Sequence, residues 1–226
     1  MTRITKHLVN LQNRIARAAA AAGRNENEVS ILAVSKRHGV DAVHEAYAAG
    51  LKAMGENYLQ EALEKMPQCD PAITWHFIGR IQSNKTRPLA ENFDWVQTVA
   101  GVKSARRLND QRPEHFAPLN ICIQVCTDDG DHGGVEPAEV ADLCDAIAGF
   151  PRLRLRGLMT IPAPSDTESE QRKPFRLLKS LYDELNSAGH RLDTLSMGMT
   201  DDLEAAIAEG STMVRIGTAL FGPRPE

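Results

Sequence analysis

Short apolar runs alternate with amphipathic segments along almost the whole chain. Apolar runs bounded by glycine, proline or polar residues predict buried strands, and segments with apolar positions at helical spacing predict helices. The first helix carries Leu8, Leu11 and Ile15 on one face and ends near Gly23. Eight strands are predicted, at residues 29–35, 51–55, 74–79, 95–99, 119–125, 153–159, 194–197 and 213–217.

Helical patterns separate these strands and stop at recognisable residues. The stops include Gly50, Pro67, Gly189 and Gly210, and Pro137 is expected as a first-turn proline. Alternation of strands and helices over roughly 190 residues is typical of a (β/α)8 barrel, although such barrels usually have about 250 residues. A doubly wound open sheet alternates in the same way, because periodicity does not show closure. No linker, repeat or low-complexity tract divides the sequence, so we expect one domain over residues 1–226.

Composition narrows the class of function. Of the 226 residues, 25% are charged and the net charge is −4, which does not favour nucleic-acid binding. No apolar run is long enough to span a membrane, and the polar start of the chain does not resemble a signal peptide. Buried thiols explain the cysteines better than disulfides or zinc: Cys69, Cys122, Cys126 and Cys144. We expect a cytoplasmic protein with no metal site.

Lys36 follows the first buried strand and is the first candidate for chemistry. Alternation places it on the same side as Leu32 and Val34. If that side faces the barrel interior, the amine is partly desolvated, its pKa falls and it can form a Schiff base. The alternative is an ordinary lysine whose stem lies over apolar surface while its head reaches water.

The loops after the last two strands are candidates for anion binding. In barrels, active groups lie at the carboxyl ends of strands, and phosphate often binds after strands seven and eight. These loops offer a glycine and a hydroxyl each, with Thr200 in the first and Gly217 and Thr218 in the second. Thr200 also stands where a helix N-cap belongs. The alternative is that Thr200 only caps its helix and Gly217 only turns the chain.

Three further polar residues follow or interrupt apolar strands. Arg215 alternates with its apolar neighbours, so it is expected inside the barrel, where a ligand or a remote acid such as Glu56 could partner it. Asn57 follows the second strand. His76 lies within the third, where a hydrogen-bonded core residue is the more usual role. The cluster at residues 82–85 is either a polar site or a helix-capping turn.

These segments together resemble the pyridoxal phosphate homeostasis protein family (the YggS type). The match runs in order along nearly the whole chain, and the third segment is specific to the family. The segments that carry the resemblance are AVSK at 33–36, GENY at 55–58, WHFIG at 75–79 with QSNK at 82–85, GLM at 157–159, LSMGM at 195–199 and RIGT at 215–218.

The resemblance implies a (β/α)8 barrel of the fold-type-III kind that binds pyridoxal 5′-phosphate (PLP) and lacks a second β domain. It implies six cofactor-binding residues: Lys36, Asn57, Thr200, Arg215, Gly217 and Thr218. Lys36 is implied to form an aldimine with PLP, the residues of the two last loops to hold its phosphate, and Arg215 to lie near the pyridine nitrogen. No catalytic residue is implied.

Two departures from the family bear on a second PLP site. Where the family often has another lysine just after the Schiff-base lysine, this chain has Arg37 and His38. Where the family often has a lysine in the loop after strand five, this chain has His132 within residues 130–134. A serine is common in the family at Thr200, a change that keeps the hydroxyl.

An arginine beside the pyridine nitrogen argues against strong catalysis. PLP enzymes stabilise a carbanion best when that nitrogen is protonated, usually by a carboxylate, and an arginine discourages protonation. Barrel-type racemases tolerate an arginine but use a second base from an additional domain. Here Tyr47 and Tyr182 are expected on outer helices, and only Tyr58 could stand near the site, where local helical packing is its alternative role.

We therefore expect a cytoplasmic, monomeric PLP-binding protein of vitamin B6 homeostasis, without robust turnover, that holds PLP or delivers it to PLP-dependent apoenzymes. The alternative from the enzyme class is a PLP-dependent amino-acid racemase of slow or narrow activity. A third possibility is a barrel that binds another phosphorylated metabolite.

Overall fold

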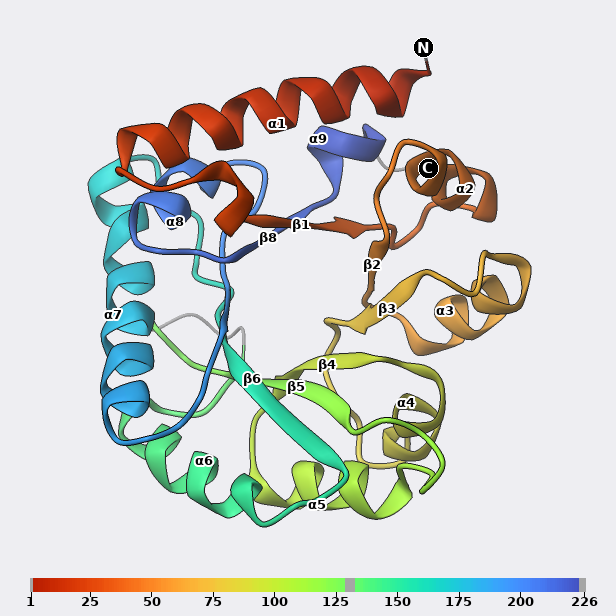
Figure 1. Ribbon diagram of the computed structural model, residues 1–226, viewed down its shortest axis with the longest axis vertical. Helices are drawn as coiled ribbons and strands as arrows, with labels where there is room; N and C mark the ends of the chain where they lie inside the picture. The colour runs from red at the N-terminus through yellow and green to blue at the C-terminus, as the bar shows by residue number, and fades with distance from the viewer. Residues whose placement is uncertain (1, 129–132, 224–226) are drawn as a thin grey trace.

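The computed structural model describes residues 2–128 and 133–223, and its eight parallel strands close into a barrel in chain order, β1 to β8 (Figure 1). The strands are β1 Ser30–Val34, β2 Ala53–Glu56, β3 Thr74–Phe77, β4 Trp95–Val99, β5 Leu119–Gln124, β6 Leu153–Met159, β7 Thr194–Ser196 and β8 Met213–Ile216. The (β/α)8 barrel is confirmed, and the open doubly wound sheet is excluded because β8 pairs with β1.

Helices surround the barrel. They are α1 Arg3–Ala21, α2 Val40–Ala48, α3 Leu59–Lys65, α4 Thr86–Asn92, α5 Val102–Gln111, α6 Val140–Ala148, α7 Glu168–Ser187, α8 Leu203–Ala208 and α9 Thr218–Phe221. Figure 1 shows α1 lying across α8 and α9, which come from the other end of the chain. Within residues 2–128 and 133–223, no helix is long and apolar enough to cross a membrane.

The strands bury both faces. Ala33, Val214 and Ile216 belong to the large core between the barrel and the helices. Leu32 and Val34 belong to a separate small cluster with Ile78 and Met213. Since alternate residues of β1 and β8 fall into different clusters, the predicted alternation is confirmed within the strands, and Leu32 and Val34 lie on the side that faces the barrel interior.

Several predicted boundaries were wrong by a few residues. β1 ends at Val34, so Lys36 lies in a turn beyond the strand. Pro137 opens a short 3₁₀ helix that precedes α6. The final helix α9 was not predicted, because four residues are too few to show helical periodicity.

Candidate functional site

Lys36 lies half-buried in the turn after β1. The next residue, Arg37, has a φ of 62° and is the only non-glycine residue with positive φ among those the structure describes. This left-handed conformation is costly for a residue with a side chain, and it persists only where its surroundings hold it. The turn that carries Lys36 is therefore a constrained segment.

The remaining predicted cofactor residues lie at the same edge of the barrel. Asn57 follows β2, Thr200 lies in the loop after β7, and Gly217 and Thr218 follow β8. Because β7, β8, β1 and β2 are consecutive neighbours in the closed barrel, their carboxyl ends form one continuous edge. An ideal Cβ on Gly217 would lie 3.5 Å from the carbonyl oxygen of Val34, which places the two loops beside each other.

The prediction that Thr200 caps α8 was wrong. The helix begins at Leu203, and Asp202 is its N-cap residue. The Thr200 hydroxyl instead accepts a 3.4 Å hydrogen bond from the backbone N–H of Ala219. Thr200 thus joins the loop after β7 to the start of α9, and both hydroxyl-bearing loops are tied together.

Arg215 is inside the barrel, as predicted, but its partners are protein groups. Its Nη1 donates to the carbonyl oxygen of Ser196 at 2.6 Å and to the Ser196 hydroxyl at 3.0 Å, and its Nη2 donates to the Thr160 carbonyl at 2.7 Å. The alternative of a salt bridge to Glu56 was wrong, because Glu56 pairs with Lys65. Burial lowers the pKa of Arg215 to about 10, so it remains a cation at neutral pH.

Arg215 belongs to a chain of buried hydrogen bonds that runs through Ser196 and Gln97 to His76. The Ser196 hydroxyl donates to Gln97 Oε1 at 2.6 Å, and Gln97 Nε2 lies 2.9 Å from His76 Nδ1. His76 also stacks on Trp95, with ring centroids 5.0 Å apart. Burial lowers the pKa of His76 to about 3, so the ring is neutral and Nδ1 accepts from the amide. The core role of His76 is confirmed.

Gln97 and Ser196 were not predicted as members of this network. Gln97 lies in the apolar run of β4, and Ser196 ends β7. Their polar side chains at inward strand positions could have marked both residues as members of a buried network. The sequence does not show, however, which inward residues from distant strands contact each other.

Asn57 lines a cavity of about 490 Å³ at the carboxyl edge, together with Thr98, Ser104 and Gln124. Its Oδ1 atom is buried and has no hydrogen-bond partner among the described residues. Buried polar atoms are usually paired, so an unpaired acceptor beside a cavity is suited to a ligand that donates a hydrogen bond.

The other polar candidates occupy ordinary structural positions. Residues 82–85 form an exposed turn before α4, with Lys85 as its N-cap residue. Tyr58 is 46% exposed and precedes α3, with its hydroxyl 3.5 Å from Arg37 Nη2. His38 stacks on Phe221 with ring centroids 5.0 Å apart. His132 lies outside the described residues.

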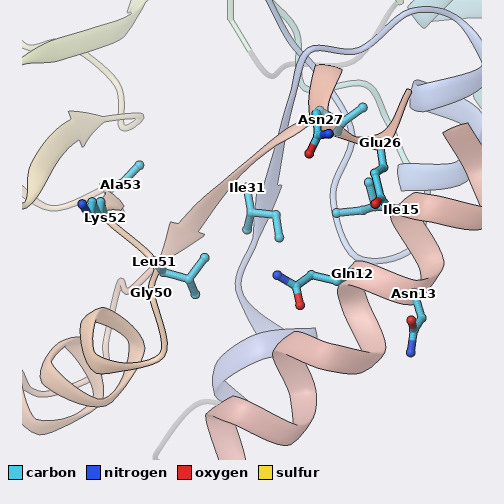
Figure 2. Close-up of a pocket in the computed structure, with 11 residues that line it drawn as sticks. Gln12, Asn13, Ile15, Glu26, Asn27, Ile31, Gly50, Leu51, Lys52 and Ala53 are labelled. Carbon is cyan, nitrogen blue, oxygen red and sulfur yellow. The ribbon is translucent and has the colours of Figure 1, made fainter. Parts of the chain in front are cut away.

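A second cavity, of about 680 Å³, lies at the opposite end of the barrel (Figure 2). It is bounded by α1 and by the amino-terminal ends of β1 and β2, with Gln12, Asn27 and Lys52 among its polar residues. In (β/α)8 barrels this end serves stability, and chemistry takes place at the carboxyl end. We therefore assign the functional site to the edge that carries Lys36.

The described residues contain no cluster of three or more side chains that could hold a metal ion. The four cysteines are free thiols, and burial raises the pKa of Cys122 and of Cys144 to about 12. Neither thiol is a nucleophile at neutral pH. Lys36 therefore stays the candidate for the reactive group of this site, and neither of these two thiols competes with it.

Known proteins resemble this chain along nearly its whole length. A protein from Pseudomonas aeruginosa named "Pyridoxal phosphate homeostasis protein" is 51% identical over 226 residues, covering 99% of this chain and 97% of that protein. The protein of the same name from Escherichia coli K12 is 45% identical over 229 residues, covering 99% of this chain and 98% of that protein.

Solved structures agree with the fold. PipY of Synechococcus elongatus, solved with PLP bound, superposes with a TM-score of 0.85 at 34% identity, covering 97% of this chain and 100% of that chain. An alanine racemase from Clostridium difficile superposes with a TM-score of 0.78 at 17% identity, covering 97% of this chain but 57% of that enzyme. The racemase therefore shares the fold.

The protein family described as "Alanine racemase, N-terminal domain" matches residues 7–225 of this chain. With the whole-length identity above, this match confirms the resemblance found in the sequence: the chain belongs to the alanine racemase N-terminal-domain family and, within it, to the pyridoxal phosphate homeostasis proteins.

Proposed function

We propose that this protein binds PLP on the Lys36 amine and serves PLP homeostasis without robust turnover. The observation that carries the proposal is the placement of one half-buried lysine beside two hydroxyl-bearing loops on a single barrel edge. The names of the curated relatives and the PLP bound in PipY support it.

The residues at this edge fit the cofactor. A lysine amine attaches an aldehyde covalently, and the Thr200 and Thr218 hydroxyls with the side-chain-free Gly217 suit a phosphate. Asn57 Oδ1 offers a buried, unpaired acceptor for a hydroxyl or N–H donor. When bound, PLP supplies an electrophilic carbonyl and an electron sink.

The surroundings favour holding the cofactor over turning over a substrate. Arg215 is a buried cation whose guanidinium donates to carbonyl and hydroxyl oxygens, and a cation opposes protonation of a nearby ring nitrogen. Tyr58, the one tyrosine beside the turn, is exposed, and its ring lies under the Arg37 guanidinium in a cation–π contact. We infer a carrier that releases PLP to apoenzymes, acting as a cytoplasmic monomer.

The proposal is tested by absorbance spectra of the purified protein with added PLP, followed by borohydride reduction and peptide mass mapping. We expect a yellow protein whose reduced pyridoxyl group maps to Lys36, no such adduct for Lys36→Ala, and a normal adduct for the exposed turn variant Lys85→Ala. A wild-type protein that takes up no PLP, or an adduct that stays on another lysine, contradicts the proposal.

Turnover is tested separately. We expect the loaded protein to exchange no α-deuterium from amino acids above the rate of free PLP. Exchange that is fast and lost in Lys36→Ala would instead establish a racemase-type enzyme. Size-exclusion chromatography with light scattering tests the monomer.

A further inference from the structure

Lys65, the last residue of α3, is a buried lysine that the cofactor site does not use. Its side chain is only 6% exposed, and it forms an ion pair with Glu56, whose side chain is fully buried. The Lys65 ammonium lies 2.8 Å from Glu56 Oε1 and also pairs with Glu61 Oε1. Its third contact is the backbone carbonyl oxygen of Ser35, at 2.9 Å. Lys65 therefore has all three of its donors engaged.

This cluster holds the chain on both sides of Lys36. On the preceding side, the Ser35 carbonyl accepts from Lys65, and the Ser35 hydroxyl donates to Glu56 Oε1 at 2.7 Å. On the following side, the backbone N–H of Arg37 donates to Glu61 Oε1 at 2.6 Å. Arg37 is the residue in the left-handed conformation. The cluster thus supplies the contacts that keep this turn in its costly shape.

Burying these three charged groups costs desolvation free energy, so the cluster adds little to the stability of the fold. Two carboxylates share one ammonium, burial raises the pKa of Glu56, and Glu56 Oε2 is buried with no hydrogen-bond partner among the described residues. Apolar side chains of similar volume usually stabilise a core as well as a buried ion pair does. An arrangement of this kind therefore points to a positional requirement at the segment that it holds.

We infer that Lys65, Glu56 and Glu61 are positioning residues for Lys36: they fix the backbone of residues 35–37 so that the Lys36 amine meets the carbonyl of PLP in a reactive geometry. This inference rests on the proposed function of Lys36. Lys65 is not a second attachment site, since its ammonium is committed to two carboxylates and a carbonyl. Misplacing a reacting group by about 1 Å costs up to roughly 100-fold in rate.

The test compares variants of the cluster with a matched buried cation elsewhere. Lys65→Met removes the central charge, Glu61→Ala removes the acceptor for the Arg37 N–H while leaving the Lys65–Glu56 pair, and Glu61→Gln keeps an acceptor oxygen. Arg112→Met is the control, because Arg112 is also buried and donates to three backbone carbonyls, those of Ala90, Phe93 and Ala117. Those carbonyls lie toward the amino-terminal ends of β4 and β5, away from Lys36.

Two quantities are measured for each variant, at a temperature well below its thermal unfolding midpoint. The first is the rate at which added PLP becomes trapped on Lys36 by borohydride. The second is hydrogen exchange of the Arg37 amide in the protein without PLP. We expect trapping to slow roughly tenfold or more in Lys65→Met and Glu61→Ala, with faster Arg37 exchange. Glu61→Gln should remain close to the wild type, and Arg112→Met should lose stability with trapping unchanged.

The outcomes separate this inference from the proposed function. If the wild type forms no adduct on Lys36, the proposed function fails and the inference fails with it. If the wild type forms the adduct and Lys65→Met and Glu61→Ala form it equally fast, only the inference is overturned. Equal slowing in Arg112→Met would also overturn it, because the effect would then follow general loss of stability.

Discussion

Gly198 and Gly217 hold matching places in the loops after β7 and β8, but only one of them is required by the protein's own packing. Gly198 has a φ of 97°, and a Cβ there would lie 2.6 Å from the Cβ of Ala206. Gly217 has a negative φ of −106°, and the nearest atom to its added Cβ is the Val34 carbonyl oxygen at 3.5 Å, an ordinary contact. Packing within the protein therefore does not require glycine at position 217, and a bound ligand would give a reason for it.

The two glycines accordingly make a matched pair of variants. Gly198→Ala should lower the free energy of unfolding by about 1–3 kcal/mol, through strain at positive φ and the contact with α8. Gly217→Ala should leave the unfolding free energy within about 1 kcal/mol of the wild type, because its φ is negative and its added Cβ would meet no atom closer than 3.5 Å. It should nevertheless weaken PLP binding roughly tenfold or more, since a methyl group fills space beside the turn of Lys36. Denaturant titration and PLP titration measure the two effects. Unchanged PLP affinity in Gly217→Ala would remove Gly217 from the site.

At the scale of elements, helix α1 ties together both loops that carry the hydroxyls. Arg14 donates to the Thr200 carbonyl oxygen at 2.9 Å and pairs with Glu204 of α8 at 2.8 Å. Arg3 donates to the Phe221 carbonyl oxygen at 2.9 Å, and His7 Nδ1 lies 2.8 Å from the Leu220 carbonyl oxygen. The first helix of the chain thus supports the loops after the last two strands (Figure 1).

Arg14→Met tests this support. It removes the contact with Thr200 and a partly exposed ion pair worth about 1 kcal/mol or less, so the change in stability should be small. Loosening the Thr200 loop should raise the Kd for PLP by a few-fold to roughly tenfold. Arg17→Met is the control, because the Arg17 guanidinium donates to the Asn13 carbonyl oxygen of its own helix. Equal PLP affinities for the two variants would show that α1 does not support the site.

The elements also show how far the sequence could predict the structure. Strand number and order followed from the apolar runs, and the inward position of Arg215 followed from alternation. Closure of the barrel did not, since it depends on the pairing of β8 with β1. The partners of Arg215 and the pairing of Glu56 with Lys65 were missed for a related reason: each joins positions whose meeting depends on the folded backbone. Thr200 was misassigned because local capping rules ignore its contact with Ala219.

At the scale of the whole molecule, the barrel interior contains a chain of hydrogen-bonded polar side chains between small apolar clusters. Arg215 donates to Ser196, Ser196 donates to Gln97, and Gln97 donates to neutral His76. The Nη atoms of Arg215, the Ser196 hydroxyl and the Gln97 amide each meet an uncharged acceptor, so the interior holds one buried cation whose hydrogen-bond partners carry no charge. A proton added to His76 would break this order, because its Nδ1 could no longer accept and a second cation would be buried.

This arrangement predicts a specific acid sensitivity. The unfolded chain binds a proton on His76 near pH 6.5, whereas the folded protein does so only near pH 3. The stability due to the neutral ring is complete above pH 6.5 and is lost as pH falls from 6.5 toward 3, at about 1.4 kcal/mol per pH unit. From pH 7 to pH 4.5, His76 alone should remove about 3 kcal/mol of unfolding free energy.

His76→Gln isolates that contribution from the carboxylates that also titrate in this range. The variant should be less stable at pH 7, since it loses the stacking on Trp95, but its stability should fall less steeply between pH 7 and pH 4.5. His44→Gln, at an exposed histidine of α2, controls for the replacement of a histidine outside the barrel interior. Urea unfolding at several pH values measures all three proteins. If the unfolding free energies of His76→Gln and the wild type fall in parallel with pH, His76 takes up its proton in the folded barrel as readily as in the unfolded chain. The assignment of a neutral, hydrogen-bonded His76 in the barrel interior would then be wrong.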